Sequence, residues 1–199
     1  MQSWFRRRIP LPLHGWPLAV LVVAFILPGI FGHDPWKTED AVAFGVVWQM
    51  VTTGHWLTLG LAGEHYFEDG PLFYWVSAAF VKGLGGVLAP HDAARVPSML
   101  FMAATFWFVR LAARELYGKV QGDLSMLAFL GCLGLVWHAH EAAAETAMLA
   151  GLAAAYYGLA ISHKKPYKSA LVFGCGAGAA FLAKGLIALL QPLAAAQSK

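Results

Sequence analysis

The sequence predicts an all-α membrane protein in which about five helices cross the bilayer and a long outer-face loop carries further helices along the membrane surface. Two features of the composition and one of its distribution support this fold class. Of the 199 residues, 59% are hydrophobic and 13% are charged, whereas soluble domains average about 45–50% apolar and about 25% charged residues. Several apolar runs approach the roughly 20 residues that a spanning helix needs. Most acidic residues lie between these runs.

The first expected span is residues 16–31, which follow three arginines at positions 6–8. The run ends in Pro28-Gly29 without a small-residue cleavage motif, so an uncleaved span is expected rather than a signal peptide. Arginines before a first span favour a cytoplasmic N-terminus. The further expected spans are 96–113, 124–137, 142–161 and 170–183, and the apolar tail 186–196 either prolongs the last of these or begins a broken one.

The segment 72–89 is ambiguous, because Lys82 lies at its middle and three glycines lie near its end. If it spanned the membrane, the basic clusters around Arg114 and Lys164 would both fall outside. If it does not span, both fall in the cytoplasm, as the usual distribution of basic residues requires. We therefore expect an interfacial helix here. The predicted organisation is one membrane domain over 1–199, with the first span at 16–31, the outer loop at 33–95 and the remaining spans within 96–196.

Within the outer loop, a helix is expected to begin near Thr38 and to end before Gly54. Val42, Val46 and Met50 recur at intervals of four residues, which favours a helix that lies along the membrane surface.

Glu39 and Asp40 open this helix and have two interpretations. Acidic residues at a helix N-terminus complement the helix dipole. Alternatively, one of these carboxylates is a general base for a reacting hydroxyl or amine. Glu145, which opens a later span, has the same two interpretations, and the functional one places it in the same cavity as Glu39.

Three further groups are candidates for binding. Glu68-Asp69-Gly70-Pro71 forms either a polar turn or a pair of carboxylates that bind substrate or a divalent metal. His138 and His140 are the other candidate metal ligands, although side chains two residues apart do not share a helix face. Lys184 lies in an apolar stretch, where it either extends to the membrane interface or pairs with a lipid phosphate.

The order of these residues carries a resemblance to a known family. In chain order they are Glu39-Asp40, Met50, Gly54-His55-Trp56, Tyr66-Phe67-Glu68, Pro71-Leu72-Phe73-Tyr74-Trp75, Arg95, residues 114–118, Glu145 and Lys184-Gly185. This set resembles the N-terminal portion of the integral-membrane GT-C glycosyltransferases of the aminoarabinose-transferase and protein-mannosyltransferase type.

The resemblance implies transfer of a sugar from a polyprenyl-phosphate carrier to a lipid or protein acceptor, on the outer face of a bacterial inner membrane. It implies that Glu39, Asp40 and Glu145 are catalytic residues. It also implies that Tyr66, Glu68, Asp69 and Lys184 bind substrate. Apart from a divalent metal at Glu68, His138 and His140, no cofactor is expected.

The chain departs from the family pattern at three places in the outer loop and at Glu145, which replaces an aspartate; one of the three is Val42, which stands where an arginine is frequent. Glu39 stands where the family has an aspartate and is one methylene longer. Asp69 and Gly70 replace a common Lys-Pro, so a phosphate-binding cation is missing from that position.

Two alternatives to an enzyme follow from the same residues. Members of the family are longer, so the chain is expected to be truncated relative to them, with a partner chain as the source of missing helices. A non-catalytic membrane subunit or an inactive fragment is therefore the second hypothesis. A transporter fragment with Lys184 on its pathway is the third, although the acidic residues cluster in loops rather than within spans. The basic residues form no patch of the kind that binds nucleic acid.

Overall fold

A computed structural model of the chain describes residues 15–32, 34–35, 38–132, 141–186 and 188. Over these residues the fold is almost entirely helical, as the sequence predicts, with one short hairpin. The elements are α1 (Trp16–Ile26), α2 (Thr38–Thr53), β1 (Gly60–Leu61), β2 (Glu64–His65), α3 (Leu72–Leu84), α4 (Pro90–Tyr117), α5 (Lys119–Leu130), α7 (Ala144–Ala160) and α8 (Pro166–Lys184).

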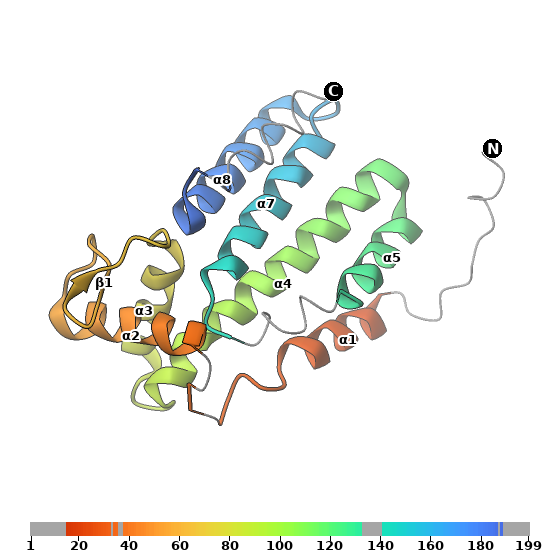
Figure 1. Cartoon of the computed structure of the whole chain (residues 1–199). Helices are drawn as coiled ribbons and strands as arrows, with labels where there is room; N and C mark the ends of the chain where they lie inside the picture. Colours follow the sequence, from red (N-terminus) through yellow and green to blue (C-terminus); the bar gives the residue numbers. More distant parts are fainter. Residues whose placement is uncertain (1–14, 33, 36–37, 133–140, 187, 189–199) are drawn as a thin grey trace.

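The long helices α4, α7 and α8 run side by side, and α5 folds back along α4 (Figure 1). The short elements α2, α3 and the hairpin gather at one end of this bundle. At that end α4 and α7 begin and α8 finishes. Segments far apart in the sequence therefore meet there.

The helices α7 and α8 approach each other closely through small residues. A Cβ on Gly151 would lie 2.6 Å from the backbone nitrogen of Ala180, and a Cβ on Gly176 would lie 2.5 Å from that of Ala155. Glycine at such crossings lets two helix backbones pack without intervening side chains. This packing brings the end of α8, with Lys184, beside the start of α7.

The helix α2 has the predicted start and end, but its apolar face does not lie against lipid. Val46 and Met50 are buried in a cluster with Phe73 and Val81 of α3, and Val42 is half-buried. Two amphipathic helices have thus covered each other's apolar faces. This apolar face is therefore buried in the protein and does not contact lipid, and the position of α2 along the membrane surface stays a prediction.

By length and composition, α4 is the helix in the described part of the chain that is able to cross a membrane, whereas α1 and α3 are apolar but shorter. At 1.5 Å per residue, the 28 residues of α4 extend about 42 Å. The 13 residues of α3 extend about 20 Å, short of the roughly 30 Å hydrocarbon core. Length does not distinguish α3 from α1, which has 11 residues and lies in the expected first span, so the interfacial position of α3 stays a prediction. The number of spans stays a prediction, and residues 133–137 and 189–196 of the expected apolar segments lie outside the described residues.

Candidate functional site

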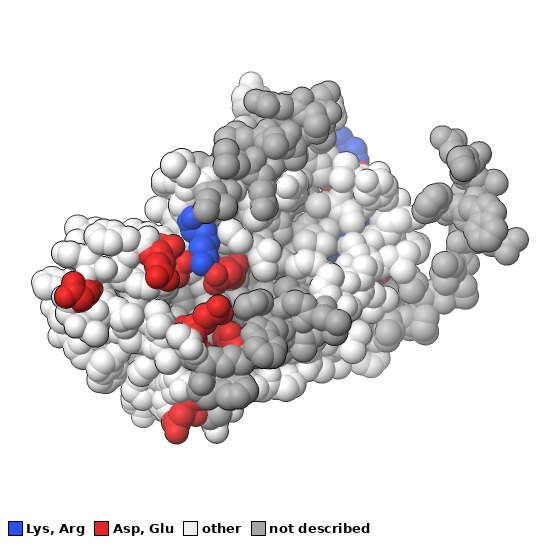
Figure 2. Space-filling view, viewed as in Figure 1, with Lys and Arg blue, Asp and Glu red and all other residues white. Residues whose placement is uncertain are grey.

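A cavity of about 200 Å³ lies where the start of α2, the loop before α3, the start of α7 and the end of α8 meet. Figure 2 shows acidic and basic side chains gathered in this region, on a face that is otherwise mostly uncharged. The charged residues of its wall are Glu39, Glu68, Asp69, Glu145 and Lys184. The remaining wall residues are Thr38, Val42, Ala43, Tyr66, Tyr74, Ala142, Ala143 and Ala144.

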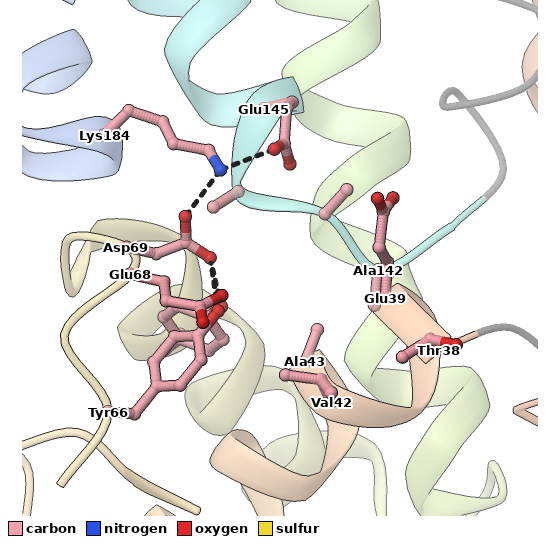
Figure 3. A pocket seen from close by; sticks show the side chains of 13 residues that line it. Thr38, Glu39, Val42, Ala43, Tyr66, Glu68, Asp69, Ala142, Glu145 and Lys184 are labelled. Carbon is pink, nitrogen blue, oxygen red and sulfur yellow. Dashed lines mark hydrogen bonds and ion pairs between the residues drawn. The ribbon is translucent and has the colours of Figure 1, made fainter. Parts of the chain in front are cut away.

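Lys184 is the cation of this wall and stands between two carboxylates (Figure 3). Its Nζ lies 2.6 Å from Asp69 Oδ1 and 2.5 Å from Glu145 Oε1. The side chain of Lys184 is 25% exposed, that of Asp69 is 9% exposed and that of Glu145 is 39% exposed. The two ion pairs join the loop before α3 to the facing ends of α7 and α8.

Two tyrosines hold the other oxygen of Asp69. The hydroxyl of Tyr66 donates to Oδ2 at 3.0 Å, and the hydroxyl of Tyr74 donates to the same atom at 2.7 Å. Burial raises the pKa of Tyr66 to about 12, and the negative charge of Asp69 acts in the same direction. Burial, followed by the charge of Asp69, also raises the pKa of Tyr74. Both phenols therefore remain protonated at neutral pH and are hydrogen-bond donors to Asp69.

Gly70 attaches the same loop to the last turn of α8. Its backbone N–H donates to the carbonyl oxygen of Ala183 at 2.8 Å. A Cβ at position 70 would lie 2.1 Å from the carbonyl oxygen of Leu182, so this approach requires glycine. Proline at this position would have no N–H to donate. The neighbours Asp69 and Gly70 thus dock the loop onto α8 beside Lys184.

The adjacent residues Glu39 and Asp40 have different surroundings. Glu39 is exposed and lines the cavity. Asp40 is 2% exposed and lies behind the cavity wall, where Arg95 donates to both of its oxygens, at 3.2 Å from Nε and 2.6 Å from Nη2. The backbone N–H of Ala142 also donates to Asp40, at 3.0 Å. Asp40 therefore ties the start of α2 to α4 and to the segment before α7.

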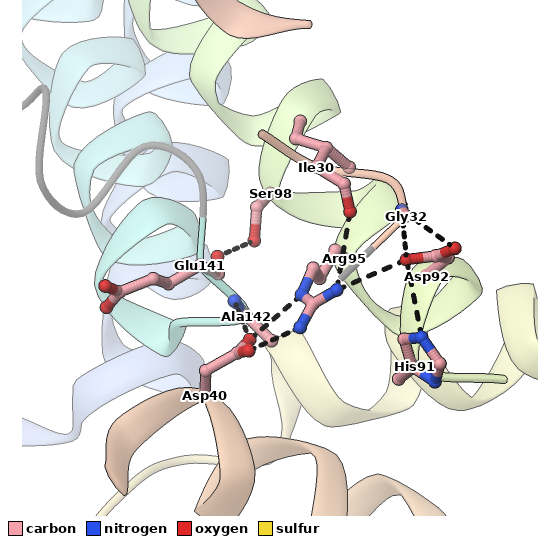
Figure 4. A network of polar contacts seen from close by, with 9 residues as sticks. All are labelled: Ile30, Gly32, Asp40, His91, Asp92, Arg95, Ser98, Glu141 and Ala142. Atoms are coloured by element: carbon pink, nitrogen blue, oxygen red, sulfur yellow. Dashed lines mark hydrogen bonds and ion pairs between the residues drawn. The ribbon is translucent and has the colours of Figure 1, made fainter. Parts of the chain in front are cut away.

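Arg95 is the centre of a buried polar network (Figure 4). Besides Asp40 it contacts Asp92, with 3.2 Å between Nη1 and Oδ1, and it donates to the carbonyl oxygen of Ile30 at 3.5 Å. Asp92 in turn accepts from the backbone N–H of Gly32 at 3.3 Å. The network fixes the segment after α1 and the start of α2 against α4. The sequence marks Arg95 as a family landmark but gives it no partner.

The structure brings together Glu39, Glu145, Tyr66, Glu68, Asp69 and Lys184 of the predicted site residues and separates Asp40 from them. His138 and His140 lie outside the described residues. Among the residues that the structure describes, no group of three or more His, Cys, Asp or Glu side chains is arranged to hold a metal ion. A metal at Glu68, His138 and His140 thus stays a prediction.

Tyr74 is a wall residue that the sequence does not single out as part of a site. Its place in an aromatic run suggests a side chain at the membrane–water boundary, but it is 1% exposed and hydrogen-bonded to Asp69. Its position in the first turn of α3, directly after the acidic loop, is the sequence signal that indicates such a contact.

Comparison with known proteins identifies the family. Residues 68–196, more than half of the chain, match the family described as dolichyl-phosphate-mannose-protein mannosyltransferase. The chain belongs to this family. The predicted relation to membrane GT-C glycosyltransferases is thereby confirmed.

Two curated relatives of this family member are aminoarabinose transferases. An undecaprenyl phosphate-alpha-4-amino-4-deoxy-L-arabinose arabinosyl transferase 1 from Pseudomonas fluorescens is 24% identical over 193 residues, which cover 89% of this chain and 32% of the relative. A transferase of the same description from Aeromonas hydrophila is 25% identical, with 89% and 33% covered. The chain thus spans about a third of the length of these relatives.

Two solved structures share the fold of this family member. ArnT from Cupriavidus metallidurans in the apo state matches with a TM-score of 0.78 and 17% identity over 88% of this chain and 33% of ArnT. The same protein bound to undecaprenyl phosphate matches with a TM-score of 0.77 and 17% identity over 87% of this chain and 32% of ArnT.

Proposed function

We propose that the cavity around Lys184 is part of the active site of an enzyme that transfers a sugar from a polyprenyl-phosphate carrier to a lipid or protein acceptor. The observation that carries the proposal is a cavity at one end of a helical bundle whose wall has four carboxylates and one cation, Lys184, which pairs with two of them. The relatives named as undecaprenyl phosphate aminoarabinose transferases support the class of donor. The family description, which names a dolichyl phosphate sugar and a protein acceptor, supports the same chemistry.

The proposed reaction is a displacement at the anomeric carbon of the sugar. The bond from this carbon to the phosphate oxygen breaks, and its electron pair leaves with the polyprenyl phosphate. Lys184 offsets the charge that develops on the departing phosphate. The acceptor's oxygen or nitrogen forms the new bond to carbon, and its proton passes to a carboxylate of the cavity.

We assign the proton acceptor to Glu39. Its side chain lines the cavity, whereas Asp40 is committed to Arg95 and to the backbone of Ala142. Asp40 thus serves as a positioning residue that holds the start of α2. Glu145 is the second carboxylate of the cavity, and Glu68 and Tyr66 orient the substrate from the loop before α3.

The charges at the two ends of the bundle support a site on the outer face of a bacterial inner membrane, with the N-terminus in the cytoplasm. The end of α4 contacts the connection between α7 and α8 through Glu115 and Lys164, whose side chains are 2.8 Å apart. Several basic residues lie near this end, away from the cavity: Arg114, Lys119, Lys164, Lys165 and Lys168. Basic residues favour the cytoplasmic side, which leaves the cavity outside.

A transfer assay in membranes tests the proposal. A radiolabelled sugar on a polyprenyl phosphate is supplied to membranes that contain this chain, alone or with a family partner that supplies further helices. We expect Glu145→Gln and Glu68→Gln to lower transfer with normal membrane insertion. Glu115→Gln, which changes a carboxylate at the opposite end, is the matched control and is expected to leave transfer unchanged. Full transfer by both cavity variants would exclude the assignment of these residues.

A further inference from the structure

We infer that Glu145 is a displaceable counter-ion of Lys184, which an incoming phosphate replaces while Asp69 stays bound and keeps the lysine in place. The inference rests on the proposed function, which places a phosphate at Lys184. Beyond the proposed function, the inference states which of the two carboxylates leaves Lys184, and that Glu145 is released when the phosphate binds.

Asp69 is the carboxylate that stays. It accepts from Tyr66 and Tyr74 in addition to Lys184, and its side chain is 9% exposed. The next residue, Gly70, is hydrogen-bonded to Ala183 of α8. Moving Asp69 away would leave the buried phenol of Tyr74, the half-buried phenol of Tyr66 and a mostly buried carboxylate without these partners, which is costly in a nonpolar surrounding.

Glu145 is the carboxylate that leaves. Within the described part of the chain, the ion pair that it makes is the one with Lys184, and its side chain is 39% exposed. It lies in the first turn of α7, where the helix dipole favours a carboxylate even without a lysine partner. Water is able to solvate the released side chain, so the exchange has a low cost for the protein.

The charge of the cavity makes this exchange useful. Lys184 is its one cation among the described wall residues, and its ammonium group, which carries three N–H donors, contacts the carboxylates of Asp69 and Glu145. A phosphate that approached this arrangement unchanged would be repelled by Glu145. After the exchange, Lys184 joins Asp69 to the phosphate, and Glu145 is released at the cavity wall. The carboxylate of Glu145 therefore becomes available for the proposed transfer after the phosphate has bound.

The exchange predicts opposite effects of two neutralising substitutions on phosphate binding. The probe is farnesyl phosphate, a short polyprenyl phosphate, titrated against the full chain in detergent and followed by tryptophan fluorescence. Glu145→Gln removes the competitor and is expected to tighten binding about three- to fivefold, as for a partly exposed ion pair. Asp69→Asn loosens Lys184 and is expected to weaken binding about tenfold. Tyr74→Phe, which removes one donor to Asp69, is expected to weaken binding by a smaller factor.

Two control variants separate this inference from the proposed function. Lys184→Met is expected to abolish binding of farnesyl phosphate, whereas Glu115→Gln is expected to leave it unchanged. Equal binding by the unaltered chain and Lys184→Met would contradict a phosphate at Lys184 and thus the proposed function. Weakened binding by Lys184→Met together with unchanged or weakened binding by Glu145→Gln would overturn the exchange alone. Melting curves of each variant show whether it is folded.

Discussion

Replacing Arg95 by methionine removes a side chain that, among the described residues, contacts the segment after α1 and the start of α2 from its position in α4. Asp40 would lose two hydrogen bonds, of 3.2 and 2.6 Å, and would keep the N–H of Ala142 at 3.0 Å. Asp92 would lose a contact of 3.2 Å. Arg95 is 1% exposed and Asp40 is 2% exposed, so water does not replace the lost partners in the folded state.

The expected cost follows from the charge left behind. Removing one partner of a buried ion pair costs about 3–5 kcal/mol, because the other charge stays buried without compensation. The remaining N–H to Asp40 places Arg95→Met at about 3 kcal/mol, the lower end of this range. Arg95→Lys keeps the charge but loses the bidentate contact with Asp40, so the free energy of unfolding is expected to fall by a smaller amount, about 1–2 kcal/mol.

The assay is unfolding by sodium dodecyl sulfate in mixed micelles, followed by circular dichroism, with a double-mutant cycle. If the pair is coupled as the structure shows, Arg95→Met combined with Asp40→Asn is less destabilised than the sum of the two single variants, by about 1–3 kcal/mol. A loss below about 1 kcal/mol for Arg95→Met, or strict additivity in the cycle, would refute the reasoning.

Three further predictions concern glycines and a tyrosine. Gly176→Ala is expected to lower the free energy of unfolding by about 1–3 kcal/mol, because the added methyl group overpacks the contact with α7. Gly174→Ala on the same helix is expected to raise it by about 0.5–1 kcal/mol, because no atom lies within 4 Å of the added Cβ. The same unfolding assay compares the two variants. Gly70→Ala is expected to separate the loop from α8 and to weaken binding of farnesyl phosphate, while Gly83→Ala, also without an atom within 4 Å, leaves it unchanged. The pKa of Tyr66 is raised from 10.0 to about 12. The contribution of its protonated form to the stability of the folded chain is therefore fully present below pH 10 and is lost as the pH rises toward 12. In a titration followed by absorbance at 295 nm, Tyr66→Phe is expected to lack a component near pH 12 that the unaltered chain shows.

The helices were predictable from the sequence because their signals are local. A threonine and two acidic residues mark the start of α2, and Gly54, with a φ of 76°, follows its end. The apolar runs similarly predict α4, α7 and α8. The hairpin was not predictable from alternation, since each strand has two residues. Its turn depends on Ala62 and Gly63, whose φ angles are 54° and 90°.

The site residues were predictable as a group, but their separate roles were not. Consecutive residues of a helix point about 100° apart, so the sequence does not tell which of Glu39 and Asp40 faces a cavity. That choice depends on Arg95, which is 55 residues away from Asp40. The pairing of Asp69 with Lys184 likewise depends on the packing of α8 against the loop, to which Gly70 contributes a backbone contact rather than a side chain.

The measurement that tests the central claim most directly is sugar transfer from a polyprenyl-phosphate donor by Glu39→Gln, compared with the unaltered chain under conditions in which the latter is active. General-base catalysis contributes about 10²–10⁴-fold, so a loss of at least about 100-fold with an unchanged unfolding midpoint is expected. Transfer by Glu39→Gln at the rate of the unaltered chain would contradict the assignment of the proton acceptor and, with it, the proposed role of the cavity.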